Sequence, residues 1–258
     1  MVDAAISSLH LRVPDTCGLA EFYCEALGMQ SVPSNLGSLS LGYVPNSCQL
    51  VFRKEAVSDR IERKNNFYWK IGITVRNLDA AVHFLEQKGV SVSEPTQFKD
   101  IGYISHIKDP NGFTIELLQC GFKGNEQSVS QGHRIGSQAT LAHLTLRVTN
   151  IAAAHDYFVN TLGMRLLSVQ PVTDHNFCLY FYSWSNERLP DPDLKSVANR
   201  EWLWARPYTL IELQHLQLPA ASIHYESSIE AGFVGFSYNK INIEPEFVSG
   251  TDLFRLCS

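Results

Sequence analysis

Leu27-Gly28-Met29 and Leu162-Gly163-Met164 decide the fold, because each closes the same pattern of a strand and a helix, and they lie 135 residues apart. Leu11-Arg12-Val13 recurs as Leu146-Arg147-Val148 at the same spacing. Two matches at one spacing indicate an internal duplication. The glycine after each helical pattern is typical of a helix terminus. The repeat therefore defines which positions of the two halves are equivalent.

Hydrophobic patterning predicts two complete units in the first half, each a strand followed by a helix and further strands. They cover residues 1–53 and 67–120. The first has a turn signal at Pro45-Asn46, and the second has one at Asp109-Pro110-Asn111-Gly112 before its last strand. Together they predict a first domain at residues 1–120.

Residues 121–138 are rich in Gly, Ser and Gln, so we expect them to connect the halves. A second domain is predicted at 139–258, with a third unit at 139–216 that contains an insertion at 186–206. The fourth unit, 230–258, is predicted to be incomplete, because it shows no helix followed by Asp-Pro-x-Gly and a strand.

The composition is that of an ordinary soluble globular protein, with 258 residues, 45% hydrophobic and 18% charged. A net charge of −5 without a basic run disfavours nucleic-acid partners, and no long apolar run predicts a membrane span. Because Met1 to Ser8 lack a signal-peptide pattern, we expect a cytoplasmic protein. The six cysteines are sparse and lack a CxxC pair, which favours free thiols.

The arginine and valine after a first strand, the helix ending in Leu-Gly-Met, and Asp109-Pro110-Asn111-Gly112 before Ile115-Glu116-Leu117 resemble the vicinal oxygen chelate superfamily, and within it glyoxalase I. The resemblance implies an α+β fold in which βαβββ modules form curled mixed sheets flanked by helices. In tandem relatives, the second module pairs with the third and the first with the fourth. The resemblance also implies a divalent metal (Zn, Ni, Fe or Mn), held by first-strand and last-strand residues of two paired modules.

Transferred through the repeat, these positions give His143 and Glu212 in the third unit, and Lys70 and Glu116 in the second. His143, Glu212 and Glu116 are therefore the expected metal ligands, with Glu116 as the catalytic base. The outer pair offers only Ser8, Gln49 and Phe233, so no second metal site is expected.

Lys70 leaves two alternatives open. As a neutral amine it could ligate the metal or act as a catalytic base, whereas as an ammonium it would pair with Glu116 or Glu212 in a metal-free site.

Arg147 matches the arginine that binds the glutathione carboxylate in this family, so the resemblance allows glutathione as a co-substrate. However, Leu216 and Asn66 stand where two other glutathione contacts would be. The aromatic residues in and around the insertion could either close a lid over an apolar substrate or pack the insertion onto the body: Trp184, Trp202, Trp204 and Tyr208.

The leading hypothesis is a metal-assisted lyase or isomerase of the glyoxalase I type that acts on a carbonyl-bearing small molecule. The alternative is a catalytically altered small-molecule-binding protein of the same fold without metal. A dioxygenase is a third option, which Phe233 and the missing last strand disfavour. A sheet edge left open by an incomplete fourth unit would favour a homodimer.

Overall fold

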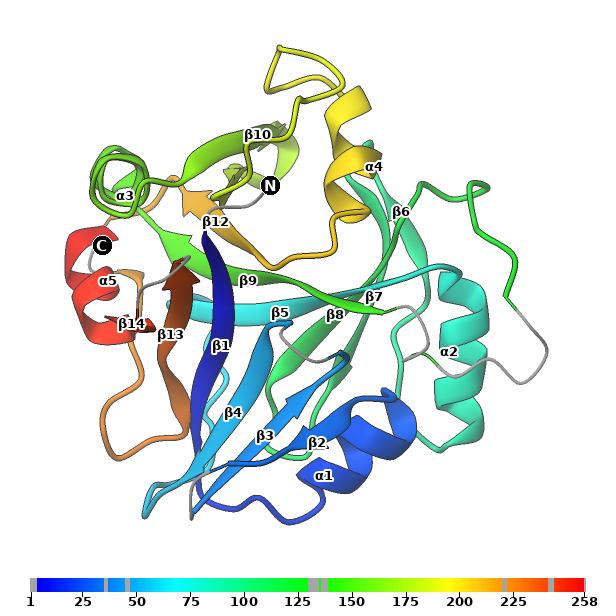
Figure 1. The fold of residues 1–258 in the computed structure, drawn as a ribbon, viewed down its shortest axis with the longest axis vertical. Coiled ribbons are helices and arrows are strands. Elements are labelled where there is room, and N and C mark those ends of the chain that lie inside the picture. Colours follow the sequence, from blue (N-terminus) through cyan, green and yellow to red (C-terminus); the bar gives the residue numbers. More distant parts are fainter. Residues whose placement is uncertain are drawn as a thin grey trace.

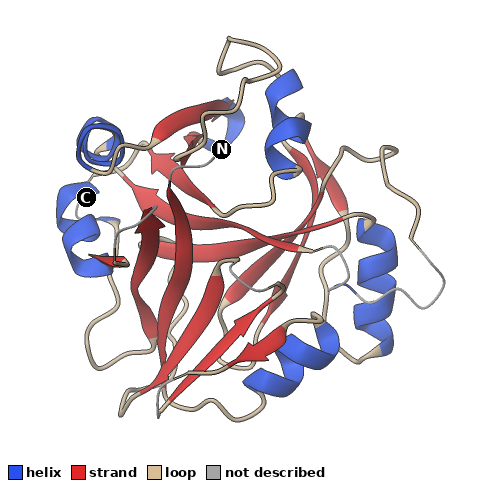
Figure 2. Cartoon of the chain, viewed as in Figure 1, coloured by secondary structure: helices blue, strands red, loops and turns tan. Residues whose placement is uncertain are grey.

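The strands form two curled sheets in the computed structural model, which describes residues 4–34, 37–44, 47–129, 135, 139–219, 222–240 and 244–257. The two sheets pack against each other (Figure 1). Figure 2 shows the helices at the periphery, around the strands. The α+β class of curled mixed sheets flanked by helices is therefore confirmed. None of the described helices is long and apolar enough to cross a membrane.

The six-stranded sheet combines the first unit with the end of the chain, in the order β14-β13-β1-β4-β3-β2. Its central strand β1 pairs in parallel with β4 and antiparallel with β13. The bounds of its strands are β1 Ala4–Val13, β2 Gln30–Val32, β3 Ser38–Gly42, β4 Gln49–Lys54, β13 Gly232–Lys240 and β14 Glu246–Ser249. The turn predicted at Pro45-Asn46 lies outside the described residues.

The eight-stranded sheet combines the second and third units, in the order β10-β11-β12-β9-β5-β8-β7-β6. The units meet where β5 and β9 pair antiparallel. The bounds of its strands are β5 Tyr68–Val75, β6 Thr96–Phe98, β7 Gly102–Lys108, β8 Thr114–Gln119, β9 Thr140–Val148, β10 Arg165–Val172, β11 Phe177–Ser183 and β12 Leu210–Leu216.

Each sheet therefore takes strands from both sides of the predicted connection 121–138. The second unit pairs with the third and the first with the end of the chain, as the resemblance implies. Residues 130–134 and 136–138 of the connection lie outside the described part of the chain. The assignment of 1–120 and 139–258 as domains stays a prediction.

The helices connect the strands as the repeat predicts. Leu19–Glu21 (α1) continues as a π-helical turn, Phe22–Ala26 (η1), and Ile151–Asp156 (α3) continues as Tyr157–Thr161 (η3). Gly28 and Gly163 follow these segments with φ of 72° and 73°, a left-handed conformation that favours glycine. The other helical segments are α2 Leu78–Gln87, the 3-10 turn η4 Thr173–His175, α4 Ala198–Trp204 and α5 Gly250–Cys257.

Residues 246–257 differ from the sequence-based expectation. The sequence shows no helix followed by Asp-Pro-x-Gly and a strand there, whereas in the structure β14 pairs antiparallel with β13, and α5 packs near α3. β14 covers the edge of β13 and is itself the edge strand of the six-stranded sheet. The homodimer stays a prediction.

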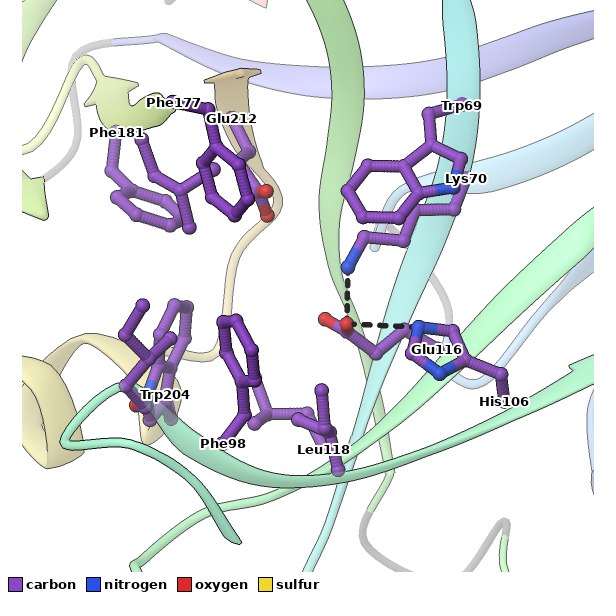
Figure 3. Close-up of a pocket in the computed structure, with 13 residues that line it drawn as sticks. Trp69, Lys70, Phe98, His106, Glu116, Leu118, Phe177, Phe181, Trp204 and Glu212 are labelled. Atoms are coloured by element: carbon purple, nitrogen blue, oxygen red, sulfur yellow. Dashed lines mark hydrogen bonds and ion pairs between the residues drawn. The ribbon is translucent and has the colours of Figure 1, made fainter. Parts of the chain in front are cut away.

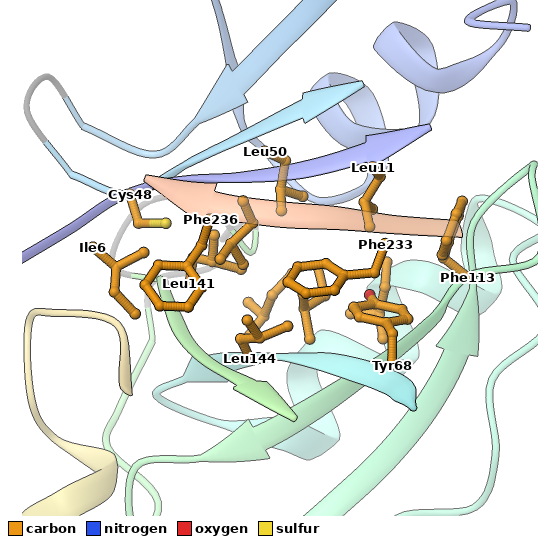
Figure 4. Close-up of a cluster of buried hydrophobic side chains, with 14 of the residues drawn as sticks. Ile6, Leu11, Cys48, Leu50, Tyr68, Phe113, Leu141, Leu144, Phe233 and Phe236 are labelled. Carbon is orange, nitrogen blue, oxygen red and sulfur yellow. The ribbon is translucent and has the colours of Figure 1, made fainter. Parts of the chain in front are cut away.

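The main core fills the space between the two sheets (Figure 4). Leu11 and Leu50 come from the six-stranded sheet, and Leu144 and Tyr68 from the eight-stranded sheet, with Phe233 stacked on Tyr68 at 5.6 Å between ring centroids. A second cluster, which includes Leu118, Phe181 and Trp204, lies where α4 packs on the eight-stranded sheet. This second cluster forms one side of the candidate site.

Candidate active site

The candidate site lies in the middle of the eight-stranded sheet, where β5, β8, β9 and β12 run side by side. His143 on β9 is the register partner of Gly72 on β5, and Gly72 is the register partner of Glu116 on β8. Glu212 on β12 is the partner of Thr145, two residues after His143. Because register partners point to the same face of a sheet, Glu116, His143 and Glu212 converge on one face.

These three residues, predicted as ligands, form one buried cluster. One ligand atom from each lies within 4.8 Å of the others. His143 Nε2 is 3.3 Å from Glu116 Oε1 and 3.3 Å from Glu212 Oε2. The His143 side chain is fully buried. An imidazole nitrogen between two carboxylate oxygens is a donor set suited to a divalent ion such as zinc.

Lys70 completes the cluster as the ion-pair partner of Glu116. Its ammonium contacts Glu116 Oε2, and both side chains are buried. Burial alone would raise the pKa of the Glu116 carboxyl, but the charge of Lys70 and the contacts with His106 and His143 hold this pKa well below its usual range. Glu116 is therefore ionised at neutral pH, with Oε2 facing Lys70 and Oε1 facing His143.

His106 is a site residue that the sequence reasoning missed. It lies on β7 as the register partner of Glu116, and its Nε2 is 3.2 Å from Glu116 Oε2. Its side chain is 34% exposed and lines the cavity above the cluster. His106 thus joins the buried cluster to the accessible surface. Its proximity to Glu116 depends on the β7–β8 register, which spacing along the chain does not reveal.

The residues present fit a divalent ion. Within the described part of the chain, neither ring nitrogen of His143 has a hydrogen-bond partner, although both are buried. A buried polar atom without a partner is costly, and a metal bond would satisfy Nε2. Glu116 can offer Oε1 while Lys70 holds Oε2. Glu116, His143 and Glu212 are therefore competent to hold one ion, whereas Lys70 stands where a fourth ligand was expected.

Thr145 adds an unpaired hydroxyl beside the cluster, and the sequence reasoning also missed it. It is the register partner of both Glu212 and Lys70, so its side chain lies between theirs on the same sheet face. The residue is fully buried, and Oγ1 has no hydrogen-bond partner among the described residues. A hydroxyl in this place can bond an oxygen atom of a ligand.

An apolar cavity opens over the cluster (Figure 3). Lys70, Glu116 and His106 lie on one side, and Phe98, Phe177 and Trp204 lie across from them. The helix α4 of the insertion contributes Trp204 to this cavity, and Trp204 Nε1 donates to the carbonyl of Ile101 at 2.9 Å. The remaining lining residues are Trp69, Ile101, Ile104, Leu118, Leu179, Phe181 and Glu212.

Comparison with known proteins identifies proteins that share this fold. Residues 5–117 match the model of the Glyoxalase/Bleomycin resistance protein/Dioxygenase superfamily. Glyoxalase I from Zea mays superposes with a TM-score of 0.64 at 17% identity, over 91% of this chain and 74% of that chain. Residues 5–117 therefore match this superfamily, and the chain has the fold of glyoxalase I. It is also 24% identical over 194 residues to a lactoylglutathione lyase of Arabidopsis thaliana, an alignment that covers 68% of this chain and spans 60% of that relative.

Arg147, the anion-binding residue expected from the superfamily resemblance, lies in a second, cationic pocket. Its guanidinium stacks on Trp69 at 4.4 Å and donates to Gln214 Oε1 at 2.9 Å. Burial, followed by the nearby charge of Arg60, lowers the pKa of Arg147 to about 10. Trp69 borders both this pocket and the apolar cavity. The other residues of the cationic pocket are Arg60, Glu62, Arg63, Lys64, Asn66 and Tyr68.

The aromatic residues of the insertion are placed differently from the expected lid. Trp184 is buried against Tyr238 at 4.8 Å, and the Tyr208 hydroxyl donates to Glu187. Trp202 packs under the guanidinium of Arg206. None of Trp184, Trp202 and Tyr208 lines the apolar cavity, so this cavity gives their expected contact with substrate no support. Trp204 is the insertion residue that reaches the cavity.

The outer pair of superfamily modules holds no comparable cluster in the described part of the chain. Ser8 and Gln49 are register partners, but Phe233 is buried in the core. His10 accepts from Arg53 through Nδ1 at 3.0 Å and contacts Ser8 Oγ at 2.8 Å. The outer face is thus a hydrogen-bonded network that includes the Arg53 guanidinium, not a set of metal ligands.

Proposed function

We propose that the protein is a metal-assisted lyase or isomerase of the glyoxalase type that acts on a carbonyl-bearing small molecule. One observation carries the proposal: Glu116, His143 and Glu212 present three buried ligand atoms within 4.8 Å of one another at the floor of an apolar cavity. Buried acidic and imidazole groups that converge in a cavity are characteristic of catalytic sites.

The three residues would hold one divalent ion, for which Zn, Ni, Fe and Mn are the candidates. When bound, such an ion supplies Lewis acidity that polarises a substrate oxygen and stabilises charge that develops on it. The apolar lining excludes water from that oxygen, which strengthens every charge interaction at the floor of the cavity.

Glu116 is the residue best placed to move a proton in this reaction. It is ionised at neutral pH, and it lines the cavity, where it can accept a proton from a substrate carbon next to the carbonyl group. Lys70 holds the Glu116 carboxylate in position through Oε2. His106, which contacts the same oxygen and is partly exposed, can pass the proton onward to solvent.

Arg147 would bind an anionic end of the substrate, for which glutathione is one candidate co-substrate. A guanidinium suits bidentate carboxylate capture, and within the described residues Arg147 has no carboxylate in ion-pair contact. Asn66 stands where a second arginine was expected. Its backbone carbonyl accepts a hydrogen bond from the Arg147 guanidinium at 3.4 Å. We therefore propose an anionic substrate tail without requiring glutathione.

The decisive test is metal content together with turnover. Purified protein is reconstituted with Zn²⁺ or Ni²⁺, and bound metal is counted by mass spectrometry before turnover of methylglyoxal is followed with and without glutathione. We expect about one equivalent, lost in His143→Ala and in Glu212→Gln and kept in His215→Ala, because His215 lies three positions after Glu212 on β12 and so faces the opposite side of the sheet. Less than about a tenth of an equivalent would contradict the proposal.

The Lys70–Glu116 ion pair supports the second candidate function, a small-molecule-binding protein of the same fold without metal. In that case the ammonium of Lys70 neutralises the carboxylates in place of a metal ion. The same metal measurement separates the two candidates. A protein that binds carbonyl ligands in the cavity yet holds no metal would be of this second kind.

A further inference from the structure

The cavity over the ligand cluster is lined chiefly by apolar side chains, of which five are aromatic: Trp69, Phe98, Phe177, Phe181 and Trp204. Phe98, Phe177, Phe181 and Trp204 lie across the cavity from Lys70 and Glu116, as Figure 3 shows. Polar groups are confined to the opposite side and the floor. A ligand that fills this cavity must therefore have one apolar end and one oxygen-bearing end.

Two of these rings are fixed in an arrangement that suits a flat ligand. Phe181 and Trp204 meet edge to face at 5.1 Å with an interplanar angle of 78°. Trp204 is pinned by its hydrogen bond to the carbonyl of Ile101, and Phe181 is fully buried. Aromatic pairs prefer edge-to-face or offset-stacked contacts at such distances. A planar ring entering the cavity can meet both a ring face and a ring edge.

The aromatic wall also stands next to the ligand cluster. The ring of Trp204 lies 6.1 Å from the imidazole of His143, centroid to centroid. A group that touches Trp204 is therefore only about one ring width from an oxygen held at the cluster. The ring of the ligand must be bonded to its carbonyl-bearing head directly or through a single carbon.

The segments that build this cavity are tied together around it. Phe98 and Phe177 both contact the ring of His175, at 5.6 and 6.1 Å between centroids, and Lys99 pairs with Asp174 across the same gap. These contacts join β6 to the turn between β10 and β11. A wall held in this way resists widening, so it selects by shape as well as by apolarity.

We infer that the substrate class of this site is the aryl-substituted vicinal-oxygen compounds, in which an aromatic ring is joined to the chelating head directly or through a single carbon. The inference rests on the proposed function for the placement of the head at Glu116, His143 and Glu212. The ring fills the cavity between Phe181, Trp204 and Phe98. The unpaired hydroxyl of Thr145 and the ammonium of Lys70 lie beside the oxygen atoms.

The test uses three hydroxamic acids that share one chelating head. Benzohydroxamic acid carries a flat ring, cyclohexanecarbohydroxamic acid a saturated ring of similar size, and acetohydroxamic acid a methyl group. Dissociation constants are measured by calorimetry and by tryptophan fluorescence, since Trp69 and Trp204 line the cavity. Each titration is carried out on the whole chain, both loaded with Zn²⁺ and metal-free.

We expect benzohydroxamic acid to bind at least about tenfold tighter than acetohydroxamic acid and at least about threefold tighter than the cyclohexyl compound, because ring burial adds to affinity and ring contacts add specificity. Equal affinities for the two rings would overturn the aromatic assignment. Equal affinities for benzohydroxamic acid and acetohydroxamic acid would overturn the inference altogether. So would the absence of binding of all three probes to both the zinc-loaded and the metal-free protein. A ring preference in a protein that cannot be loaded with metal would support the inference while contradicting the proposed function.

Two variants and a control locate the ring. Phe177→Leu keeps an apolar side chain of smaller size and should reduce the preference for benzohydroxamic acid over acetohydroxamic acid at least about threefold. Trp204→Leu should reduce this preference in the same way. If Trp204→Leu does not fold, Phe177→Leu alone tests the placement of the ring. Trp202→Leu alters the same helix outside the cavity and should leave the preference unchanged. An unchanged preference in Phe177→Leu and in a folded Trp204→Leu would contradict this placement.

Discussion

Gly72 lies so close to His143 that a Cβ atom added to it would be 1.9 Å from Cε1 of the imidazole. The two residues are register partners on β5 and β9, and the missing side chain is what lets the ring lie flat on the sheet face between the two glutamates. We predict that Gly72→Ala destabilises the fold by about 1–3 kcal/mol, the usual cost of overpacking, and weakens zinc binding. Urea unfolding and zinc calorimetry measure the two effects.

The matched control is Gly42→Ala on β3, where the nearest atom to the new methyl group would be Gln49 Cγ at an ordinary 3.5 Å. Combining Gly72→Ala with His143→Ala should recover part of the lost stability, because the clash disappears with the ring. Full additivity of the two changes would contradict the packing argument.

The Lys70–Glu116 pair leads to a second prediction. Lys70→Met removes the ammonium and leaves Glu116 close to Glu212 without a counter-charge, so we expect the metal-free protein to lose roughly 3–5 kcal/mol of stability. Zinc should restore that stability and bind at least about tenfold tighter than in the unaltered protein, because a competing cation is gone. Thermal unfolding with and without zinc measures both effects.

Lys108→Met provides the control, since Lys108 pairs with Glu62 at the surface, where both side chains are more than half exposed. We expect it to change stability by less than about 1 kcal/mol and to leave zinc affinity unchanged. Weaker zinc binding in Lys70→Met than in the unaltered protein would instead indicate that Lys70 is itself a ligand.

The repeat in the sequence, together with the superfamily resemblance, was sufficient to locate the cluster of Glu116, His143 and Glu212. His143 and Glu212 follow from the equivalent positions of the units, because strand register and facing are preserved when a module is duplicated. Glu116 follows from the last strand of the second unit in the same way. The structure brings all three to one face of the eight-stranded sheet.

Other site residues could not be predicted, because their roles depend on contacts between strands. His106 and Thr145 reach the cluster through the registers of β7 with β8 and of β9 with β12, and bulges shift the register between β5 and β9. Whether Trp204 or Trp202 lines the cavity depends on how α4 is rotated against the sheet. The helix α5 follows a strand too short and too exposed to give a clear pattern.

The unpaired hydroxyl of Thr145 gives a third prediction. Thr145→Val removes a buried polar group that has no partner among the described residues, so stability should stay the same or rise by up to about 1 kcal/mol. If the hydroxyl bonds the ligand, the affinity of metal-loaded protein for benzohydroxamic acid should fall roughly 2–12-fold, as expected for one hydrogen bond. Chemical unfolding and ligand calorimetry test the two parts separately.

Thr209→Val is the matched control for Thr145→Val, because it removes a hydroxyl that has a partner within the protein. The hydroxyl of Thr209 donates to the carbonyl of Leu141, so its removal should cost about 1–2 kcal/mol and leave ligand affinity unchanged. A loss of stability in Thr145→Val as large as that in Thr209→Val would show that the Thr145 hydroxyl has a partner within the protein.

The turn before β8 gives a prediction on pH. Burial raises the pKa of Asp109 to about 6, although Oδ1 accepts from the backbone N–H groups of Asn111 and Phe113, each at 2.9 Å, and Oδ2 accepts from Tyr23. The folded protein therefore binds this proton more tightly than the unfolded chain, in which the pKa of an aspartate is near 3.8. Asp109 favours the fold most below about pH 4, and this contribution declines as the pH rises through the interval from about 4 to 6.

Asp109→Asn should remove this dependence, because an amide keeps the oxygen acceptor, can donate to the Tyr23 hydroxyl, and does not ionise. We expect the free energy of unfolding of the variant, relative to that of the unaltered protein, to rise by up to about 3 kcal/mol between pH 4 and pH 7. Burial, followed by the charge of Arg53, lowers the pKa of His10 to about 4. His10 therefore changes stability with pH in the opposite direction. It does so equally in both proteins, so its effect cancels in the difference between them. Urea unfolding at several pH values measures that difference. A difference that does not change with pH would mean that Asp109 is already ionised throughout the interval, with its two backbone hydrogen bonds outweighing burial.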